Sequence, residues 1–286
     1  MAWGGERKEW RLMATKTKAF VLCGLFAAMM PSLANAANVA QWKMQDNAAS
    51  TTVVATVGSN GTLTNAGNTS ASTTTGPGGT LTAALTIDDT NDYISVTSGN
   101  SAASQNVGVL TLCAWVKPGT DTGERTIVYI QNASGTARAD LSFQSNGAIR
   151  AGGRAGNTES FQSVTTTADY DDGSWHHVLA VINYATDTIT VYVDGSSVST
   201  TGTPSFTATA TTNDAATDMR IGSRLGSSTT QLNAPIADVR IYNSDESANV
   251  ATIRADGISS SGTIDPLSSS IPGSSADPLT GTIPGR

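Results

Sequence analysis

The feature that most constrains this chain is the recurrence of apolar residues at every second position in many short segments. In TDTITVYVDG, Ile189, Val191 and Val193 fall on one side of an extended chain, and polar or aromatic residues fall on the other. Because side chains alternate between the two faces of a β-strand, this segment predicts a strand with one buried face. The Asp194-Gly195 pair that follows predicts a tight turn. The pattern favours β-sheet over helix.

Similar segments recur between clusters of Gly, Asn and Asp. HHVLAVINY is apolar on both faces, which indicates a central strand covered on both sides and joined to the previous segment by a short turn. Many short strands with turns at this spacing predict an all-β fold, a two-sheet antiparallel sandwich or jelly roll. The other predicted strands are 39–44, 92–96, 109–118, 126–131, 139–144, 148–152, 218–223 and 236–243.

The two ends of the chain lack the alternation. Residues 1–36 contain a basic segment, an apolar run too short for a membrane span and a small-residue cleavage site, which predict an upstream extension and a secretory signal peptide. Residues 37–256 are then the folded domain. Residues 257–286 are a Ser/Pro/Gly-rich tail with two copies of one pattern at a period of 12. We expect a secreted, extracellular or cell-surface protein whose disordered or extended tail joins copies into a homo-oligomer.

Charge and cysteine content narrow the partners and the covalent bonds. The chain carries 16 Lys and Arg against 23 Asp and Glu, a formal net charge of −7, so it repels phosphate backbones and we expect no nucleic-acid partner. Cys23 lies in the signal peptide, which leaves Cys113 alone and excludes an internal disulfide. Cys113 stands among the alternating apolar residues of VLTLCAWVKP and is predicted to be a buried strand thiol.

The adjacent histidines, His176 and His177, are the first candidates for chemistry. Because neighbours on a strand point to opposite faces, their rings cannot converge on one metal or share one proton. Nucleophile elbows, phosphate-binding glycine loops and zinc-ligand clusters are missing from the sequence. Glu124, Glu159 and Glu246 lie in predicted loops or past the last strand, which disfavours the carboxylate pair of glycoside hydrolases. The sequence therefore predicts that the protein is not an enzyme.

Two stretches in the second half carry a family resemblance: DGSWHHVLAVINYATDTITVYVDG and RIGSRLGSSTTQLNAPIADVRIYN. VAQWKMQDNAAS, IDDTNDYISV and LTLCAWVKP precede them in the family's order. Residues 39 to about 256 thus resemble the LamG-like domains, the laminin-G type of concanavalin A-like jelly roll in exported bacterial and phage proteins. The resemblance implies a sandwich of two curved antiparallel sheets that binds a glycan or a cell-surface protein on a rim or concave face.

The same resemblance implies a structural Ca²⁺ ion at the sandwich edge. In the family pattern one acidic residue follows the first strand and another stands in the last strand, which here are Asp46 and Asp238. Ca²⁺ binds roughly six to eight oxygen ligands, so two carboxylates would supply its charge. The sequence departs from the pattern at Met44-Gln45 and lacks the usual Glu after Ala237-Asp238. A solvent-facing Asp238 on an edge strand is the alternative.

Two functions are compatible with these features. The first is a secreted, non-catalytic carbohydrate- or surface-binding module, in which Trp42, Trp115 and Trp175 are expected in the core rather than as stacking surfaces for sugars. The second is a structural protein, a self-assembling surface, filament or virion-decorating subunit, which the Ser/Thr/Ala/Asn-rich and lysine-poor composition favours. Analogy of fold does not choose between them.

Overall fold

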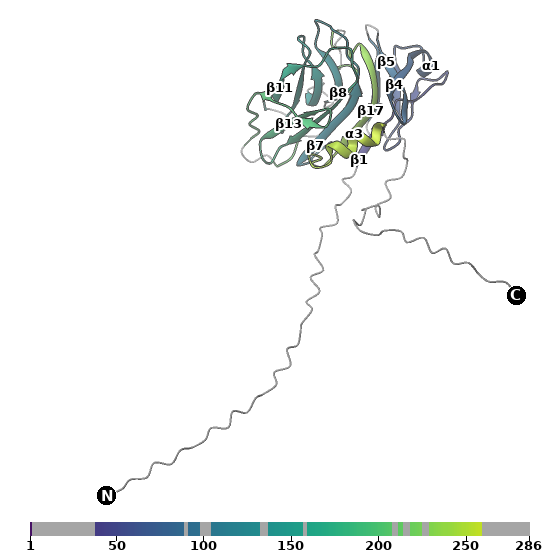
Figure 1. Cartoon of the computed structure of the whole chain (residues 1–286). Helices are drawn as coiled ribbons and strands as arrows, with labels where there is room; N and C mark the ends of the chain where they lie inside the picture. Colours follow the sequence, from purple (N-terminus) through teal and green to yellow (C-terminus); the bar gives the residue numbers. More distant parts are fainter. Residues whose placement is uncertain are drawn as a thin grey trace, which may run out of the picture. The chain divides into compact units, whose positions relative to one another are not determined.

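The alternating segments form two antiparallel sheets that pack face to face (Figure 1). The predicted all-β jelly-roll sandwich is confirmed. Most of the predicted signal peptide, and the tail repeats beyond residue 258, lie outside the residues that the structure describes. The computed structural model describes Met1 and the ranges 38–88, 91–97, 104–131, 137–156, 159–207, 211–213, 218–224 and 229–258.

One sheet has eight strands, and it joins the two ends of the described domain. Its strands are β1 (Asn38–Trp42), β4 (Thr73–Gly78), β5 (Leu81–Ile87), β7 (Val109–Val116), β12 (His176–Asn183), β13 (Thr188–Val193), β14 (Ser196–Ser197) and β17 (Ala234–Tyr242). They lie in the order β14-β13-β12-β7-β17-β5-β4, and β1 also pairs with β17. The first described strand is therefore hydrogen-bonded to the last.

The other sheet has nine strands and carries the candidate site. Its strands are β2 (Thr52–Val53), β3 (Gly61–Thr64), β6 (Tyr93–Thr97), β8 (Arg125–Gln131), β9 (Ala137–Phe143), β10 (Ala148–Gly153), β11 (Gln162–Asp169), β15 (Thr200–Thr201) and β16 (Asp218–Ile221). They lie in the order β15-β11-β10-β9-β8-β16-β6-β3-β2. β8, β9 and β10 are consecutive in both sequence and space.

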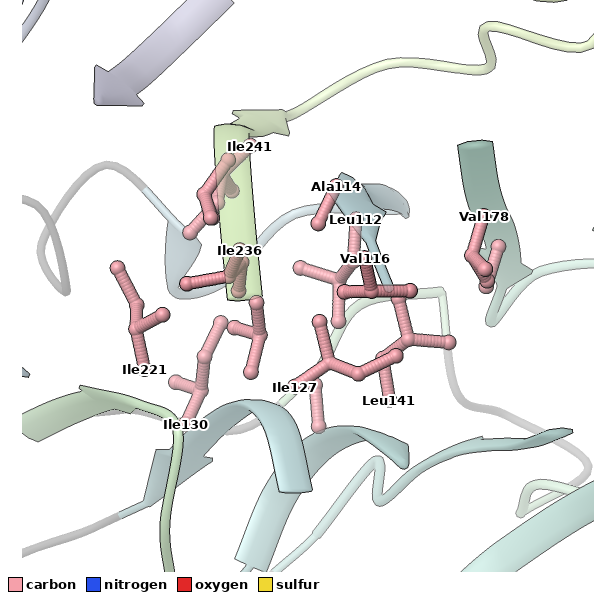
Figure 2. Packing of buried hydrophobic residues seen from close by; sticks show 14 of the residues in the cluster. Leu112, Ala114, Val116, Ile127, Ile130, Leu141, Val178, Ile221, Ile236 and Ile241 are labelled. Carbon is pink, nitrogen blue, oxygen red and sulfur yellow. The ribbon is translucent and has the colours of Figure 1, made fainter. Parts of the chain in front are cut away.

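The hydrophobic core lies between the sheets. Leu112 and Val116 of β7 point from the eight-stranded sheet toward Ile127 and Leu141 of the nine-stranded sheet (Figure 2). All four side chains are fully buried. Burial of an aliphatic side chain of this size stabilises the fold by about 1.5–3 kcal/mol, so the alternation that predicts the strands also supplies the energy that packs them.

Each strand predicted from alternation is present, with ends displaced by a few residues. Strands without clean alternation were not predicted. In β11 threonine and serine dominate, and only Val164 and Thr166 are buried. In β5 both faces are buried, because Leu81 and Ala84 pack on the outer side of the sheet while Leu85 and Ile87 face the core.

Two helices were also missing from the prediction. The short helix α1 (Thr69–Ser72) begins after Asn68, whose side chain accepts a hydrogen bond from the Ala71 amide. Helix α3 (Val250–Ile258) covers part of the outer face of the eight-stranded sheet (Figure 1). The described fold therefore extends past the predicted boundary at residue 256. Within the described ranges, no helix is long and apolar enough to cross a membrane.

Contacts under α3 explain why a short helix is stable there. Val250 and Ile253 pack against Cys113 and Tyr242 of the sheet. Cys113 is buried, as predicted, and burial raises the pKa of its thiol to about 12. At Gly257 a Cβ atom would lie 2.8 Å from Nε1 of Trp115, so the glycine permits the close approach of the helix.

Candidate functional site

A polar row crosses the outer face of the nine-stranded sheet. The strand registers align Gly152, Asp140, Tyr129, Arg220 and Ser95 from β10 to β6. The chain neighbours of each of these residues point into the sandwich, so the five positions face outward. This face presents charged and hydroxyl groups where the opposite face of the same strands is apolar.

Two arginines and two carboxylates meet along this row. We call Glu124, Asp140, Arg150 and Arg224 the arginine–carboxylate cluster. Nη2 of Arg224 lies 2.6 Å from Oδ2 of Asp140 and also contacts Oε1 of Glu124. Nη2 of Arg150 contacts the same two carboxylate oxygens. The Ser142 hydroxyl donates to Oδ2 of Asp140 at 3.4 Å. Two guanidinium groups thus share two carboxylates.

Four separate segments supply the cluster. Asp140 and Arg150 are outward positions of β9 and β10, Glu124 directly precedes β8, and Arg224 follows β16. The Asp140 side chain is 1 % exposed, whereas Arg150, Arg224 and Glu124 are 20 %, 24 % and 26 % exposed. Asp140 therefore forms the base of the cluster, and the other three side chains provide its solvent-accessible surface.

The cluster is not fully hydrogen-bonded. Oδ1 of Asp140 and Nε of Arg150 and of Arg224 are buried, and none has a hydrogen-bond partner within the described part of the chain. Buried polar atoms are normally paired, and unpaired ones mark strain or a binding role. Burial raises the pKa of Asp140 to about 6, and the Glu124 carboxylate adds to this rise while Arg150 opposes it. A buried acceptor and two buried donors are thus held in one place.

Aromatic rings border the cluster. The guanidinium carbon of Arg224 lies 5.7 Å from the ring centroid of Tyr129. Farther along the row, the guanidinium carbon of Arg220 lies 4.0 Å from the ring centroid of Tyr93. On the other side, the Phe161 ring occupies the space that a Cβ atom of Gly152 would need, next to Asp140 in the register. Charged groups are therefore flanked by rings on both sides.

The structure gives Asp238 a structural role. Nε of Arg240 donates to both of its carboxylate oxygens at 3.0 Å, and Nη2 donates to Oδ2 at 2.6 Å. Gln41 of β1 donates to Oδ1 at 2.7 Å, and Arg240 also pairs with Asp256 of α3 at 2.8 Å. Asp238 is 1 % exposed and lies in the interior strand β17. The alternative of a solvent-facing Asp238 on an edge strand is therefore wrong.

The second predicted calcium ligand, Asp46, lies after β1 and accepts a hydrogen bond from the Val54 amide at 3.0 Å. In the part of the chain that the structure describes, no interaction joins it to Asp238, and no group of three or more His, Cys, Asp or Glu residues is arranged to hold a metal. The positive charge of Arg240 on both Asp238 oxygens opposes cation binding. These donors do not fit Ca²⁺, and calcium binding by Asp46 and Asp238 remains a prediction.

The two histidines point to opposite faces, as predicted. His177 is buried with its ring centroid 5.3 Å from that of Trp115, and burial lowers the pKa of His177 to about 3, with a further lowering by Arg240. His176 contacts Oδ2 of Asp194 through Nδ1 at 2.8 Å and Oδ1 of Asp172 through Nε2 at 3.2 Å. Each histidine thus has a local structural partner.

The tryptophans are packed as expected. Trp42 and Trp115 are buried, and Trp175 packs against the cluster that contains Trp115. Nε1 of Trp42 donates to the Ser59 carbonyl at 3.1 Å. None of the three offers a free ring surface to a ligand.

A separate cavity of about 340 Å³ lies at the edge of the sandwich, next to β13 and β15. Hydroxyl groups of Thr188, Thr190 and Thr200 line it, and Val164 and Ile189 contribute its apolar part. It contains a single ionisable lining residue, Asp187, whose Oδ1 accepts a hydrogen bond from the Phe206 amide at 3.0 Å. This cavity is far less charged than the arginine–carboxylate cluster.

Sequence analysis missed the arginine–carboxylate cluster. Glu124 was correctly placed outside the strands, but its contact with Asp140 was not foreseen. One signal was available: Asp140 and Arg150 stand at the polar positions of the alternating segments ADLSF and AIRAG. Alternation indicates that both face outward, yet it does not show which segments become neighbours.

Comparison with known proteins supports the fold. The family model described as Laminin_G_3, concanavalin A-like lectin/glucanases superfamily, matches residues 88–249. No curated protein sequence matches this chain.

Three solved structures are similar. One, titled "Cell entry of botulinum neurotoxin type C is dependent upon interaction with two ganglioside molecules", has a TM-score of 0.55 and 14% identity over 78% of this chain and 51% of that chain. The botulinum neurotoxin serotype D/C VPI 5993 binding domain gives 0.53 and 14%, over 77% and 52%. Trypanosoma rangeli sialidase in complex with the inhibitor DANA gives 0.51 and 16%, over 77% and 32%. This chain spans about half of the toxin chains and a third of the sialidase chain. At these identities the similarity shows the fold alone.

The similarity to a sialidase chain overturns one prediction. The sequence analysis excluded enzymatic activity because known catalytic motifs were missing and the glutamates were placed in loops. That exclusion is wrong as an inference, since a chain with similar structure is an enzyme. The loop position of Glu124 also did not keep it from a second carboxylate, because Glu124 and Asp140 share the same two arginines.

Proposed function

Because this chain belongs to the concanavalin A-like lectin/glucanases superfamily, we propose that it is an exported carbohydrate-binding protein. The proposed binding surface is the outer face of the nine-stranded sheet, centred on the arginine–carboxylate cluster. The observation that carries the proposal is the buried, unpartnered Oδ1 of Asp140 beside two partly exposed arginines. Export is supported by the basic and apolar segments within residues 1–36.

Sugar chemistry suits this surface. Sugar hydroxyls both donate and accept hydrogen bonds, so they match a place where guanidinium N–H donors lie beside carboxylate oxygens. The rings of Tyr129 and Phe161 give the same surface an apolar border. Binding sites typically combine a few convergent polar groups with apolar surroundings. The ganglioside and SialylT complexes of the similar toxin domains also support a glycan as the partner.

Hydrolysis of a glycosidic bond is a second candidate function. It is favoured by the two carboxylates, Glu124 and Asp140, which meet on the same guanidinium groups. A raised pKa, such as that of Asp140, is what a general acid requires. The low exposure of Asp140 favours binding over catalysis, because a general acid must reach the substrate oxygen. Release of reducing sugar from glycans that the protein binds would establish this activity.

A glycan array tests the binding proposal directly. We expect wild-type protein to retain a defined set of glycans, and Arg150→Gln to reduce that binding by about tenfold or more, as expected for loss of a charged hydrogen bond. Arg254→Gln is the matched control, since Arg254 lies over Trp115 beside the other sheet. Circular dichroism should show that both variants are folded.

Two results would contradict the proposal. Absence of any glycan binding by folded wild-type protein would remove the function. Binding that is equal in wild type and Arg150→Gln would remove the site, and the threonine-lined cavity beside β13 would then be examined with Thr190→Val.

The alternative of a self-assembling structural subunit depends on the tail repeats. These repeats lie outside the described residues. Light scattering of the full chain and of a chain ending at residue 258 tests whether the tail joins copies into a homo-oligomer. Equal masses for the two chains would remove that role of the tail.

A further inference from the structure

We propose that the arginine–carboxylate cluster recognises glycans through a carboxylate on the sugar, which takes the position of Glu124 on Arg150 and Arg224. This inference rests on the proposed carbohydrate-binding function and specifies its ligand class as acidic sugars. The mechanism is an exchange of one carboxylate for another, with no covalent step.

The first argument is the supply of donors. Each guanidinium carries five N–H groups in a planar arrangement that matches a carboxylate. In the described contacts between the four cluster residues, Arg150 and Arg224 each use only Nη2, and their acceptors are one oxygen of Glu124 and one of Asp140. Nε of each arginine is buried without a partner there. The cluster therefore has more donors than acceptors, and it favours a ligand that brings acceptor oxygens.

The second argument is the unequal burial of the two carboxylates. Asp140 is almost fully buried beneath the arginines, and its position is set by β9. Glu124 is 26 % exposed and lies outside the strands. Displacing Glu124 into solvent opens the arginine pair while Asp140 stays in place. Glu124 thus occupies the arginines in the free protein and is the group that a ligand carboxylate replaces.

The third argument is charge balance. In the free protein the two arginines are balanced by Glu124 and Asp140. When a ligand carboxylate replaces Glu124, the arginine pair is still balanced, so the exchange leaves no unpaired buried charge. A neutral sugar that displaced Glu124 would leave one positive charge uncompensated, which is costly away from bulk water.

The surrounding face adds to this preference. Arg220 stands in the same outward row, and Arg154 lies close enough to act electrostatically on Tyr129. Nε of Arg154 is also buried without a partner in the described structure. On a chain with net charge −7, this local group of arginines is the part of the described surface that attracts an anion.

The test compares acidic sugars with neutral forms of the same sugars, using the full exported chain and isothermal titration calorimetry. The first probe pair is the methyl glycoside of N-acetylneuraminic acid and its methyl ester. The second is methyl glucuronide and methyl glucoside. We expect the acid of at least one pair to bind about tenfold more tightly than its neutral form, because only the acid offers a charged bidentate partner. The two pairs distinguish nonulosonic from hexuronic acids.

Variants test the exchange itself. Glu124→Gln should tighten binding of the acid by several-fold, because the competing charge is removed, and Arg150→Gln should weaken it by about tenfold. Asp245→Asn, which removes a carboxylate between β17 and α3, should leave the affinity unchanged. The acid–ester comparison on wild-type protein needs no variant, so it holds even if a substitution impairs folding.

The outcomes separate this inference from the function on which it rests. Equal affinity for acid and neutral forms, or no gain in Glu124→Gln, would overturn the acidic-sugar inference while glycan binding on the array would still stand. Failure of wild-type protein to bind any glycan would overturn both.

Discussion

Nη2 of Arg224 lies 2.6 Å from Oδ2 of Asp140, although 84 positions separate the two residues in the sequence. Asp140 is on β9 and Arg224 follows β16, and β8 runs between these strands in the sheet. The arginine therefore reaches across β8, past the Tyr129 ring. The contact links strands that are not direct neighbours, and it exists only because of the order in which the sheet is assembled.

Removal of Arg224 should destabilise the fold. Arg224→Met leaves the buried Asp140 carboxylate with one arginine fewer, and we expect the free energy of unfolding to fall by about 1–3 kcal/mol. Urea denaturation followed by tryptophan fluorescence measures this loss. Arg254→Met, which removes an arginine packed over Trp115, should cost less. A larger loss in the control would mean that the cluster contributes little to stability.

Asp140 should make stability depend on pH. Its folded-state pKa, about 6, lies above the model value of 3.8, so folding favours its protonated form. The contribution of this group to stability is fully present below about pH 4 and is lost as the pH rises through about 6. The stability of wild type relative to Asp140→Asn should therefore decline over this interval. Urea titrations at a series of pH values test this, and a relative stability that rises with pH would contradict it.

Calcium should have little effect on stability, because Arg240 already occupies both oxygens of Asp238. We expect melting temperatures in calcium and in chelator to agree within about 1 °C, since a ligand that binds the native state would raise the melting temperature. Differential scanning fluorimetry is sufficient. A rise of several degrees that is lost in Asp46→Asn would instead support the predicted calcium site.

Helix α3 should detach when Gly257 acquires a side chain. A Cβ atom at this position would lie 2.8 Å from Nε1 of Trp115 and 2.9 Å from Oδ2 of Asp238. We expect Gly257→Ala to cost about 1–3 kcal/mol, the usual range for overpacking. Gly119→Ala is the matched control, because no atom lies within 4 Å of its added Cβ. Similar losses in both variants would argue against a tightly packed helix.

Cys113 should react slowly in the native protein. It is buried beneath α3, and burial raises the pKa of its thiol to about 12, so the reactive thiolate is scarce near neutral pH. Labelling with a thiol reagent should be slow in buffer and fast in denaturant. Gly257→Ala should accelerate native labelling if α3 protects the thiol. Fast labelling of the native wild type would show that the helix does not stay docked.

The sequence alone determined the strands with clean alternation, as in the segment of Ile189, Val191 and Val193. The period of two is a local property of extended backbone, so burial of one face can be predicted without knowing the partner strand. The opposite directions of His176 and His177, and the burial of Cys113, follow from the same local rule and are confirmed.

Only the tertiary structure decided the strands and the site that depend on distant partners. In β11, threonine-rich residues are held in a strand by pairing with β10 and β15, and α3 is stable because it packs on the eight-stranded sheet. Glu124 and Arg224 reach Asp140 because β8, β9 and β16 assemble in that region of the sheet. Hydrogen bonding between strands joins residues at any sequence separation, so alternation shows which way a side chain faces but not what it meets.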